Sequence, residues 1–209
     1  TALGYNALTA NTTASDNTAV GYKSLEANTT GAYNIATGAN ALRTNTTGAN
    51  NTAVGYNALR ANTTASNNVA IGYQAADALT TGDLNVAIGV NALGAATTSD
   101  RNVAIGKDAL AAFSATGDNY LVAIGFNAMG ATTTGGNNAA VGGSAMASNT
   151  TGGSNTAVGI NALFTNTTAG SCTAVGKSAL YNSNAGDNTA IGKQSLQANT
   201  TGTSNTAVG

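Results

Sequence analysis

A glycine that returns every 17 residues is the feature that most restricts how this chain can fold. Its spacing departs from 17 only twice, with 19 residues between Gly106 and Gly125 and 16 between Gly176 and Gly192. Self-similarity at a fixed period is the signature of a repeat architecture. Residues 1–209 therefore read as one repetitive segment with no internal domain boundary. These anchor glycines are Gly4, Gly21, Gly38, Gly55, Gly72, Gly89, Gly106, Gly125, Gly142, Gly159, Gly176, Gly192 and Gly209.

The residues around the anchor glycine alternate small and large side chains. The position two before it is alanine in every copy, and the position one before it is Val, Ile or Leu in all copies except at Thr37. Three after it stands Ala or Ser, and four after it stands Leu in most copies. A polar stretch, most often Asn-Thr-Thr followed by Gly or Ala, then leads to the next copy. The alternation before the glycine is typical of a β-strand.

A repeat of this length and composition predicts a stacked β-coil. Seventeen residues are too few for a helical hairpin, and the recurrent Asn-Thr-Thr turns would break a continuous helix. Each repeat is expected to form a strand, a tight turn, a shorter strand through Ala-Leu and a polar return. Parallel pairing at about 4.8 Å per coil would make a rod on the order of 55–60 Å long. The predicted fold class is all-β, a parallel β-solenoid (β-roll) of about twelve 17-residue coils.

Three details of the coil can be predicted from the pattern. The bulky position before the anchor suggests one buried ladder and the leucines a second, and the asparagines at residues 17, 34, 51, 68, 85 and 102 suggest an amide ladder. Leu121 and Cys172 interrupt that asparagine row. The two extra residues before Gly125 should bulge at residues 114–120 and leave residues 122–124 in register. The expected aliphatic ladders contain Val54, Ile71, Ile88 and Ile105 with Leu59, Leu93 and Leu110.

The expected core is thin, which predicts self-association. Two large apolar residues per coil bury little surface against an ordering cost of roughly 1.5 kcal/mol per residue. The invariant alanine and glycine suggest a face where neighbouring chains could approach closely. A homotrimer with those small residues near the chain–chain contact is therefore expected.

Composition argues against catalysis and against several kinds of partner. The chain has no histidine, and charged residues make up only 7% of it. It therefore lacks the commonest general base and metal ligand, and the single Cys172 can form neither an internal disulfide nor a Cys/His pair. We expect no enzyme activity, no catalytic, cofactor-binding or metal-binding residues, and no cofactor. The scattered charges and the net charge of −1 make nucleic acid a poor partner, and no apolar run is long enough to span a membrane.

Several repeated residues also permit a functional interpretation. Asn-Thr-Thr matches the N-glycosylation acceptor pattern, although it recurs because the turn recurs. Tyr5, Tyr22, Tyr56 and Tyr73 follow anchor glycines and could bind a glycan, but stacking along the rod is the favoured interpretation. Ice binding through threonine arrays is a weaker alternative, since the paired threonines are adjacent. The acidic residues of the middle third fit solvated turns better than a calcium site; they are Asp77, Asp83, Asp100, Asp108 and Asp118.

The repeat resembles two known families of fibrous proteins. Asn-Thr-Ala-Val-Gly at residues 51–55 and Asn-Val-Ala-Ile-Gly at residues 68–72 are similar to the Ser-Val-Ala-Ile-Gly strand of YadA-like head repeats in trimeric autotransporter adhesins. Asn-Thr-Ala-Val-Gly-Tyr-Asn-Ala-Leu also resembles repeat arrays of phage tail-fibre-like proteins. The resemblance covers the whole chain and implies a left-handed parallel β-roll, three chains around one axis and a role in adhesion. The period of 17, against about 14 or 15 in the head repeats, implies a longer return loop.

Together these observations predict a structural fibre or stalk segment. The expected location is extracellular, on a cell surface or on a virion, and the expected partners are two further copies of the chain and a host or surface receptor. An adhesin whose rod surface itself binds a receptor is the alternative. The lack of atypical terminal repeats suggests a window on a longer fibre.

Overall fold

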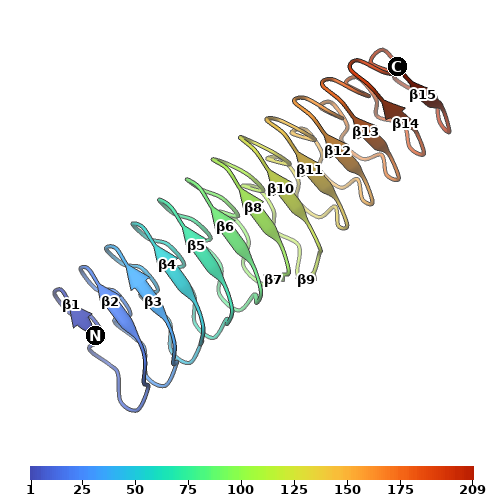
Figure 1. The fold of residues 1–209 in the computed structure, drawn as a ribbon. Coiled ribbons are helices and arrows are strands. Elements are labelled where there is room, and N and C mark those ends of the chain that lie inside the picture. Colours follow the sequence, from blue (N-terminus) through green and yellow to red (C-terminus); the bar gives the residue numbers. More distant parts are fainter.

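The computed structural model describes all 209 residues and shows a straight rod of stacked coils (Figure 1). Each coil contributes one short strand to a 13-stranded parallel sheet, and no residue is helical. This confirms the predicted parallel β-solenoid. The main sheet contains, in order, β1 (Ala2–Leu3), β2 (Thr18–Val20), β3 (Ile35–Thr37), β4 (Thr52–Val54), β5 (Val69–Ile71), β6 (Val86–Ile88), β8 (Val103–Ile105), β10 (Val122–Ile124), β11 (Ala139–Val141), β12 (Thr156–Val158), β13 (Thr173–Val175), β14 (Thr189–Ile191) and β15 (Thr206–Val208).

Pairing is in register along the whole rod. Equivalent residues face each other in neighbouring strands, as Ala70 faces Ala87 and Ile71 faces Ile88. The 19-residue coil keeps this register, because β10 pairs residue for residue with β8. Its extra residues lie in the return loop, where β7 (Ser99–Asp100) and β9 (Gly117–Asp118) form a separate two-stranded sheet. The predicted bulge at residues 114–120 is therefore confirmed.

The second strand expected through Ala-Leu is absent, because the backbone there adopts left-handed turns. Leu59 has a φ of 49° and Leu93 a φ of 53°, and the residue two after the anchor is also left-handed, as at Asn57 with a φ of 57°. These leucines are nevertheless fully buried and form the main apolar ladder of the interior. A left-handed backbone disfavours β-branched side chains. This explains why the leucine position accepts Met129, Met146 and Ala76 but never Val or Ile.

The prediction that Val54, Ile71, Ile88 and Ile105 are buried is wrong. Val54 is 36% and Ile71 38% exposed, whereas the alanine between the two outward residues of each strand is completely buried from Ala19 to Ala190. Strand alternation places the alanine inside and its two neighbours outside. Because the leucine ladder already fills the narrow interior, only a methyl group fits on the strand facing it. The prediction from the sequence pattern had therefore exchanged the inward and the outward face of the strand.

Buried asparagines form ladders on the inner side of the coil. Asn68 donates through Nδ2 to the carbonyl oxygen of Gly82 at 2.9 Å, and its Oδ1 accepts the backbone N–H of Asn85 at 2.8 Å. The same arrangement repeats in the neighbouring coils, where Asn51 bonds Ala65 at 2.8 Å. These amides satisfy backbone groups of the turn that strand pairing leaves free. The predicted asparagine ladder is thus confirmed and lies inside the coil.

The leucine ladder leads to a first testable expectation. We expect Leu93→Ile to lower the free energy of unfolding by about 2 kcal/mol or more. A β-branched residue is strained at φ 53°, and its side chain cannot take the position of the leucine side chain in the ladder. Leu93→Met is the matched control and should cost less than about 1.5 kcal/mol. Urea unfolding followed by circular dichroism measures both. Equal losses for the two variants would contradict the role assigned to the left-handed turn.

Candidate interaction surface

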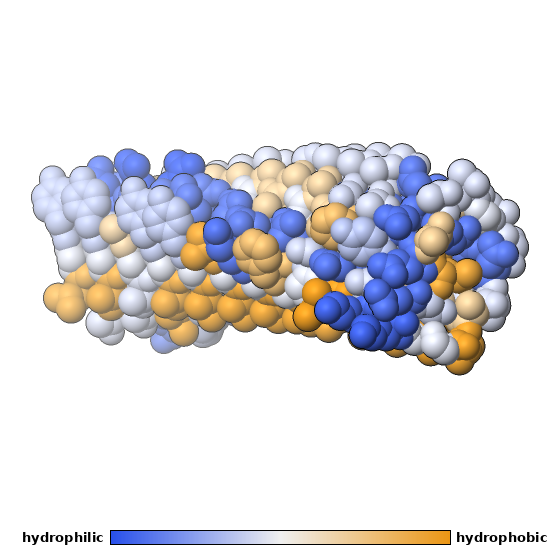
Figure 2. All heavy atoms as spheres, turned by 90° about the horizontal axis from the view of Figure 1, so that it is seen from above, coloured by the Kyte–Doolittle hydropathy of each residue, from blue (hydrophilic) through white to orange (hydrophobic).

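The outward side of the 13-stranded sheet is a largely aliphatic surface in which threonine is the main polar residue, and it is here named the strand face. It consists of the first and third residues of each strand, such as Thr52 and Val54 in β4 and Val69 and Ile71 in β5. Its members are half-buried or exposed, with Ile35 46% and Ile191 43% exposed. Figure 2 shows a hydrophobic band that follows the rod along one edge. Because the coils are in register, this face extends along the entire rod.

The small-residue contact between chains that the sequence suggested is not available in this fold. The invariant alanine is buried inside its own coil, so it cannot meet another chain. The anchor glycine packs against the glycine of the next coil: a Cβ built on Gly72 would lie 2.6 Å from the carbonyl oxygen of Gly89. Both residues are therefore small because of packing within one chain. The predicted chain–chain contact through the invariant alanine and the anchor glycine is therefore wrong.

A row of aromatic residues borders the strand face near the start of the rod. The rings of Tyr5 and Tyr22 stack with centroids 5.5 Å apart, and those of Tyr56 and Tyr73 stack at 5.4 Å. All four side chains are about half exposed or more. This confirms the predicted stacking along the rod, and the exposed rings remain accessible to a ligand. A third stacked pair, Phe164 and Tyr181, lies elsewhere on the coil with centroids 5.1 Å apart.

Few charged groups interact along the rod. Glu26 accepts a hydrogen bond from Arg43 at 2.9 Å and pairs with Lys23 at 3.1 Å. These cations, Arg43 foremost, hold the pKa of Glu26 below its ordinary value. Burial raises the pKa of Asp77 although Arg60 lies 3.7 Å away. All of these groups lie on the turns that follow the anchor glycines.

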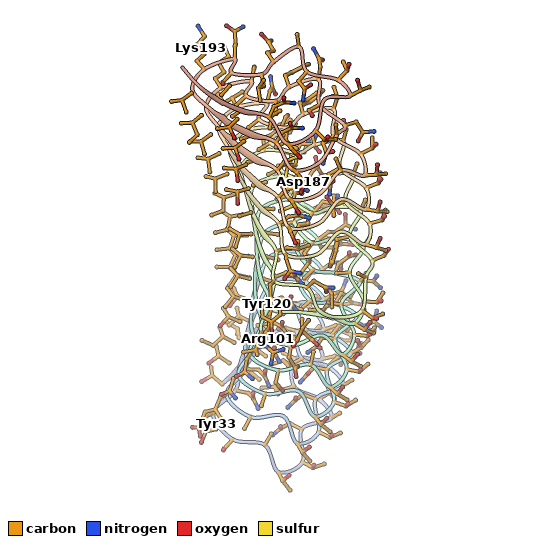
Figure 3. The ribbon with its side chains drawn as sticks, turned by 90° about the vertical axis from the view of Figure 1, so that its right-hand side faces the viewer. Tyr33, Arg101, Tyr120, Asp187 and Lys193 are labelled. Atoms are coloured by element: carbon orange, nitrogen blue, oxygen red, sulfur yellow. The ribbon has the colours of Figure 1, made fainter.

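The acidic residues of the middle third do not assemble into a metal site. Asp83, Asp100 and Asp118 occupy the same row of successive coils, and one oxygen of each is engaged within the turn. Asp83 accepts the backbone N–H of Ser66, Asp100 accepts that of Asp83, and Asp118 pairs with Arg101. No group of three or more His, Cys, Asp or Glu residues could hold a metal ion. Figure 3 shows Arg101 and Tyr120 next to each other about half-way along the rod. The predicted role of these carboxylates in turns agrees with their hydrogen bonds.

The inner asparagines of the Asn-Thr-Thr turns are structural. Asn28, Asn45, Asn62, Asn149 and Asn166 have no exposed surface. Asn45 donates to the side chain of Asn28 at 2.7 Å and to the carbonyl oxygen of Gly48 at 2.9 Å. A side chain enclosed in this way is out of reach of a glycosylating enzyme once the coil has formed. The turn interpretation of this repeat therefore holds at these positions.

Cys172 occupies an asparagine position inside the coil. Its thiol is buried and lies 3.3 Å from the carbonyl oxygen of Ala185. Burial raises the pKa of the thiol, and cysteines buried in this way are generally structural. Cys172 thus fills a place in the interior and adds no chemistry to the surface.

The surface is open and regular along its whole length. No enclosed pocket is found on the molecule, and none of its segments is a helix of the length and hydropathy needed to cross a bilayer. The features that stand out are the strand face and the aromatic row beside it. Comparison with family models, with curated proteins and with solved structures finds no match to this chain.

Proposed function

We propose that the chain is a shaft segment of an extracellular or virion fibre that supports adhesion or host attachment and works as a homotrimer. The observation that carries the proposal is the strand face, a surface of aliphatic and threonine side chains that extends along thirteen paired strands. A monomer that exposed it would leave a long apolar band in water. Large exposed apolar patches mark interaction sites.

The size of the strand face suits association of copies. Twelve coil spacings of about 4.8 Å and a width of about 12 Å for two side-chain rows give roughly 700 Å² per chain. Stable interfaces bury about 800 Å² per partner, so this face with its bordering residues reaches the required range. Its mostly aliphatic composition, with Thr as the main polar residue, resembles the core of an interface more than a solvated surface.

Self-association in parallel follows from the regularity of the rod. When parallel copies of the chain meet in register, every coil of one copy lies against the equivalent coil of the next. Each strand then adds the same contact between strand faces. Closed cyclic symmetry covers such a face on all copies at once. The resemblance to trimeric adhesin repeats favours three chains, with the strand faces turned toward a common axis. Fibrous proteins of both resembled families act in attachment, which supports the adhesive role.

Charged substitutions on the strand face test this assignment. We expect the double variant Ile71→Lys, Ile88→Lys to lose assembly, lowering the association constant at least a thousandfold, since each buried unpaired ammonium costs several kcal/mol. The matched control is Thr47→Lys, Thr64→Lys, which places the same two charges on exposed residues of the return turn. Light scattering gives the mass, and circular dichroism shows whether the coil persists.

Retention of full assembly by the strand-face variant would overturn the proposed interface. A wild-type chain that stays monomeric with its strand face exposed would favour the ice-binding alternative, because β4, β12 and β13 each present an outward Thr-Val pair on a regular array.

A further inference from the structure

The aromatic row beside the strand face has an interruption of one residue. The positions after successive anchor glycines hold Tyr5, Tyr22, Ala39, Tyr56 and Tyr73. Hydrogen bonds show that these are consecutive coils, because the backbone N–H of Asn40 bonds the carbonyl oxygen of Tyr22 at 2.8 Å and that of Asn57 bonds Ala39 at 3.0 Å. A methyl group therefore stands where its neighbours on both sides carry a phenol ring.

The two tyrosine pairs leave two ring faces turned toward Ala39. Tyr5 stacks on Tyr22 with 10° between the ring planes, and Tyr73 stacks on Tyr56 with 14°. Each pair thus covers one side of its inner ring. The other sides of Tyr22 and Tyr56 are separated by two coil spacings, about 10 Å. The coil between them carries only the methyl group of Ala39 at this position, and the ammonium of Lys23 lies beside Tyr22. Both inner rings are about half exposed.

This spacing fits one six-membered ring. A ring placed midway would have its centroid about 5 Å from each tyrosine, close to the 5.5 and 5.4 Å that separate the stacked tyrosines themselves. A pyranose has the required size and presents an apolar C–H face on each side, while its hydroxyl groups need polar partners at the rim. The same two coils supply such partners in Lys23, Glu26 and Arg43.

The charges near the interruption favour a sugar that carries a negative charge. The ammonium group of Lys23 lies 5.6 Å from the ring centroid of Tyr22, and Glu26 connects it to the guanidinium of Arg43. Two cations share one carboxylate, so a positive charge is left over. Arg43 is 40% exposed and its remaining N–H groups can donate to a sugar carboxylate.

We propose that the interruption of the aromatic row at Ala39, here named the step, binds one pyranose ring of an anionic oligosaccharide. The sugar ring is held between the facing rings of Tyr22 and Tyr56. Since no pocket encloses the ring, one chain binds weakly, and an assembly of several chains would gain from multivalency. The site belongs to one chain, so it does not depend on the proposed trimer. It adds a receptor-binding element to a shaft.

The test titrates the purified chain with hexagalacturonate and, separately, with the neutral cellohexaose, and follows heat release and tyrosine fluorescence. Tyrosine fluorescence can be followed because the chain has no tryptophan, and two of its seven tyrosines line the site. We expect hexagalacturonate to bind more tightly than cellohexaose. Ala39→Tyr should weaken this binding about tenfold or more, because the new ring completes the stack and occupies the space of the sugar. Tyr56→Ala should weaken it similarly by removing one of the two faces.

Two matched variants separate the site from general aromatic exposure. Gly143→Tyr adds a tyrosine at the same position of another coil, where a Cβ meets nothing within 4 Å, and Tyr73→Ala removes a ring of the same row without touching the step. Both should bind like the unmodified chain. Undiminished binding by Ala39→Tyr, an equal loss in Tyr73→Ala and Tyr56→Ala, or no binding of either oligosaccharide would overturn the proposal. Equal affinity for the two sugars would refute the preference for a negative charge.

Discussion

Replacing one anchor glycine by alanine, as in Gly72→Ala, is expected to destabilise the rod by several kcal/mol. Gly72 has a φ of 134°, a conformation that residues with a side chain rarely adopt. An added Cβ would also lie 2.6 Å from the carbonyl oxygen and 2.8 Å from the carbonyl carbon of Gly89. Backbone atoms of a paired coil cannot move away individually, so the stack must open at this point. Strain and steric clash therefore act together, and the expected loss is among the largest for a single methyl group.

Gly143→Ala is the matched control for this substitution. Gly143 directly follows an anchor glycine, lies outside the left-handed region and would meet nothing within 4 Å of its new Cβ. We expect a change within about 0.5 kcal/mol. Urea midpoints of both variants, measured by circular dichroism, compare the two sites. Similar midpoints for Gly72→Ala and Gly143→Ala would show that the coils do not approach as closely as described.

The second large effect is expected from Asn68→Ala in the buried amide ladder. The amide of Asn68 bonds the carbonyl oxygen of Gly82 and accepts the N–H of Asn85. Alanine would leave both backbone groups buried without a partner, at about 1–3 kcal/mol each. We therefore expect a loss of about 3 kcal/mol or more, again measured from urea unfolding.

Two further variants separate hydrogen bonding from packing at this position. Asn68→Leu restores volume without restoring hydrogen bonds, as Leu121 does in the same row, and should recover only part of the loss. Thr64→Ala changes an exposed residue of the return turn and should have little effect. Full stability of Asn68→Leu would mean that the ladder contributes volume alone.

The repeat length and the glycine spacing were sufficient to predict the fold. A 17-residue period with a strand signal before each glycine leaves stacked parallel coils as the consistent arrangement. The two irregular intervals could also be interpreted, since insertions in a solenoid go to the loops when every strand has two paired neighbours. The loop before Tyr120 shows this, because β10 keeps its register with β8.

The orientation of the strand could not be predicted from side-chain size. In most proteins the larger apolar residue of an alternating pair faces the core. Here the interior is so narrow that Leu59 and its equivalents fill it, and the strand contributes only the methyl group of alanines such as Ala53. The left-handed φ of Leu59 directs the chain into this compact turn. The clue present in the sequence was the absence of Val and Ile at the leucine position.

Because the faces of the strand are exchanged, the candidate interaction surface also differs from the one that the sequence suggested. Invariant small residues suggested a close contact between chains, whereas they are fixed by contacts within a chain. The outward residues of the strand face, such as Val54 and Ile71, vary among Val, Ile, Leu, Ala and Thr along the rod. An interface made of methyl-bearing side chains tolerates such variation. The interruption at Ala39 required the stacking geometry of the tyrosine pairs and was not predicted.

The mass of the chain in solution tests the central claim most directly. Sedimentation equilibrium at micromolar concentration should give three times the chain mass of 20.2 kDa, because the strand face is large and apolar enough to hold copies together. The double variant Ile71→Lys, Ile88→Lys should sediment at the single-chain mass with its β-structure intact. A wild-type chain of single mass across the concentration range, with the strand face open to solvent, would contradict the account.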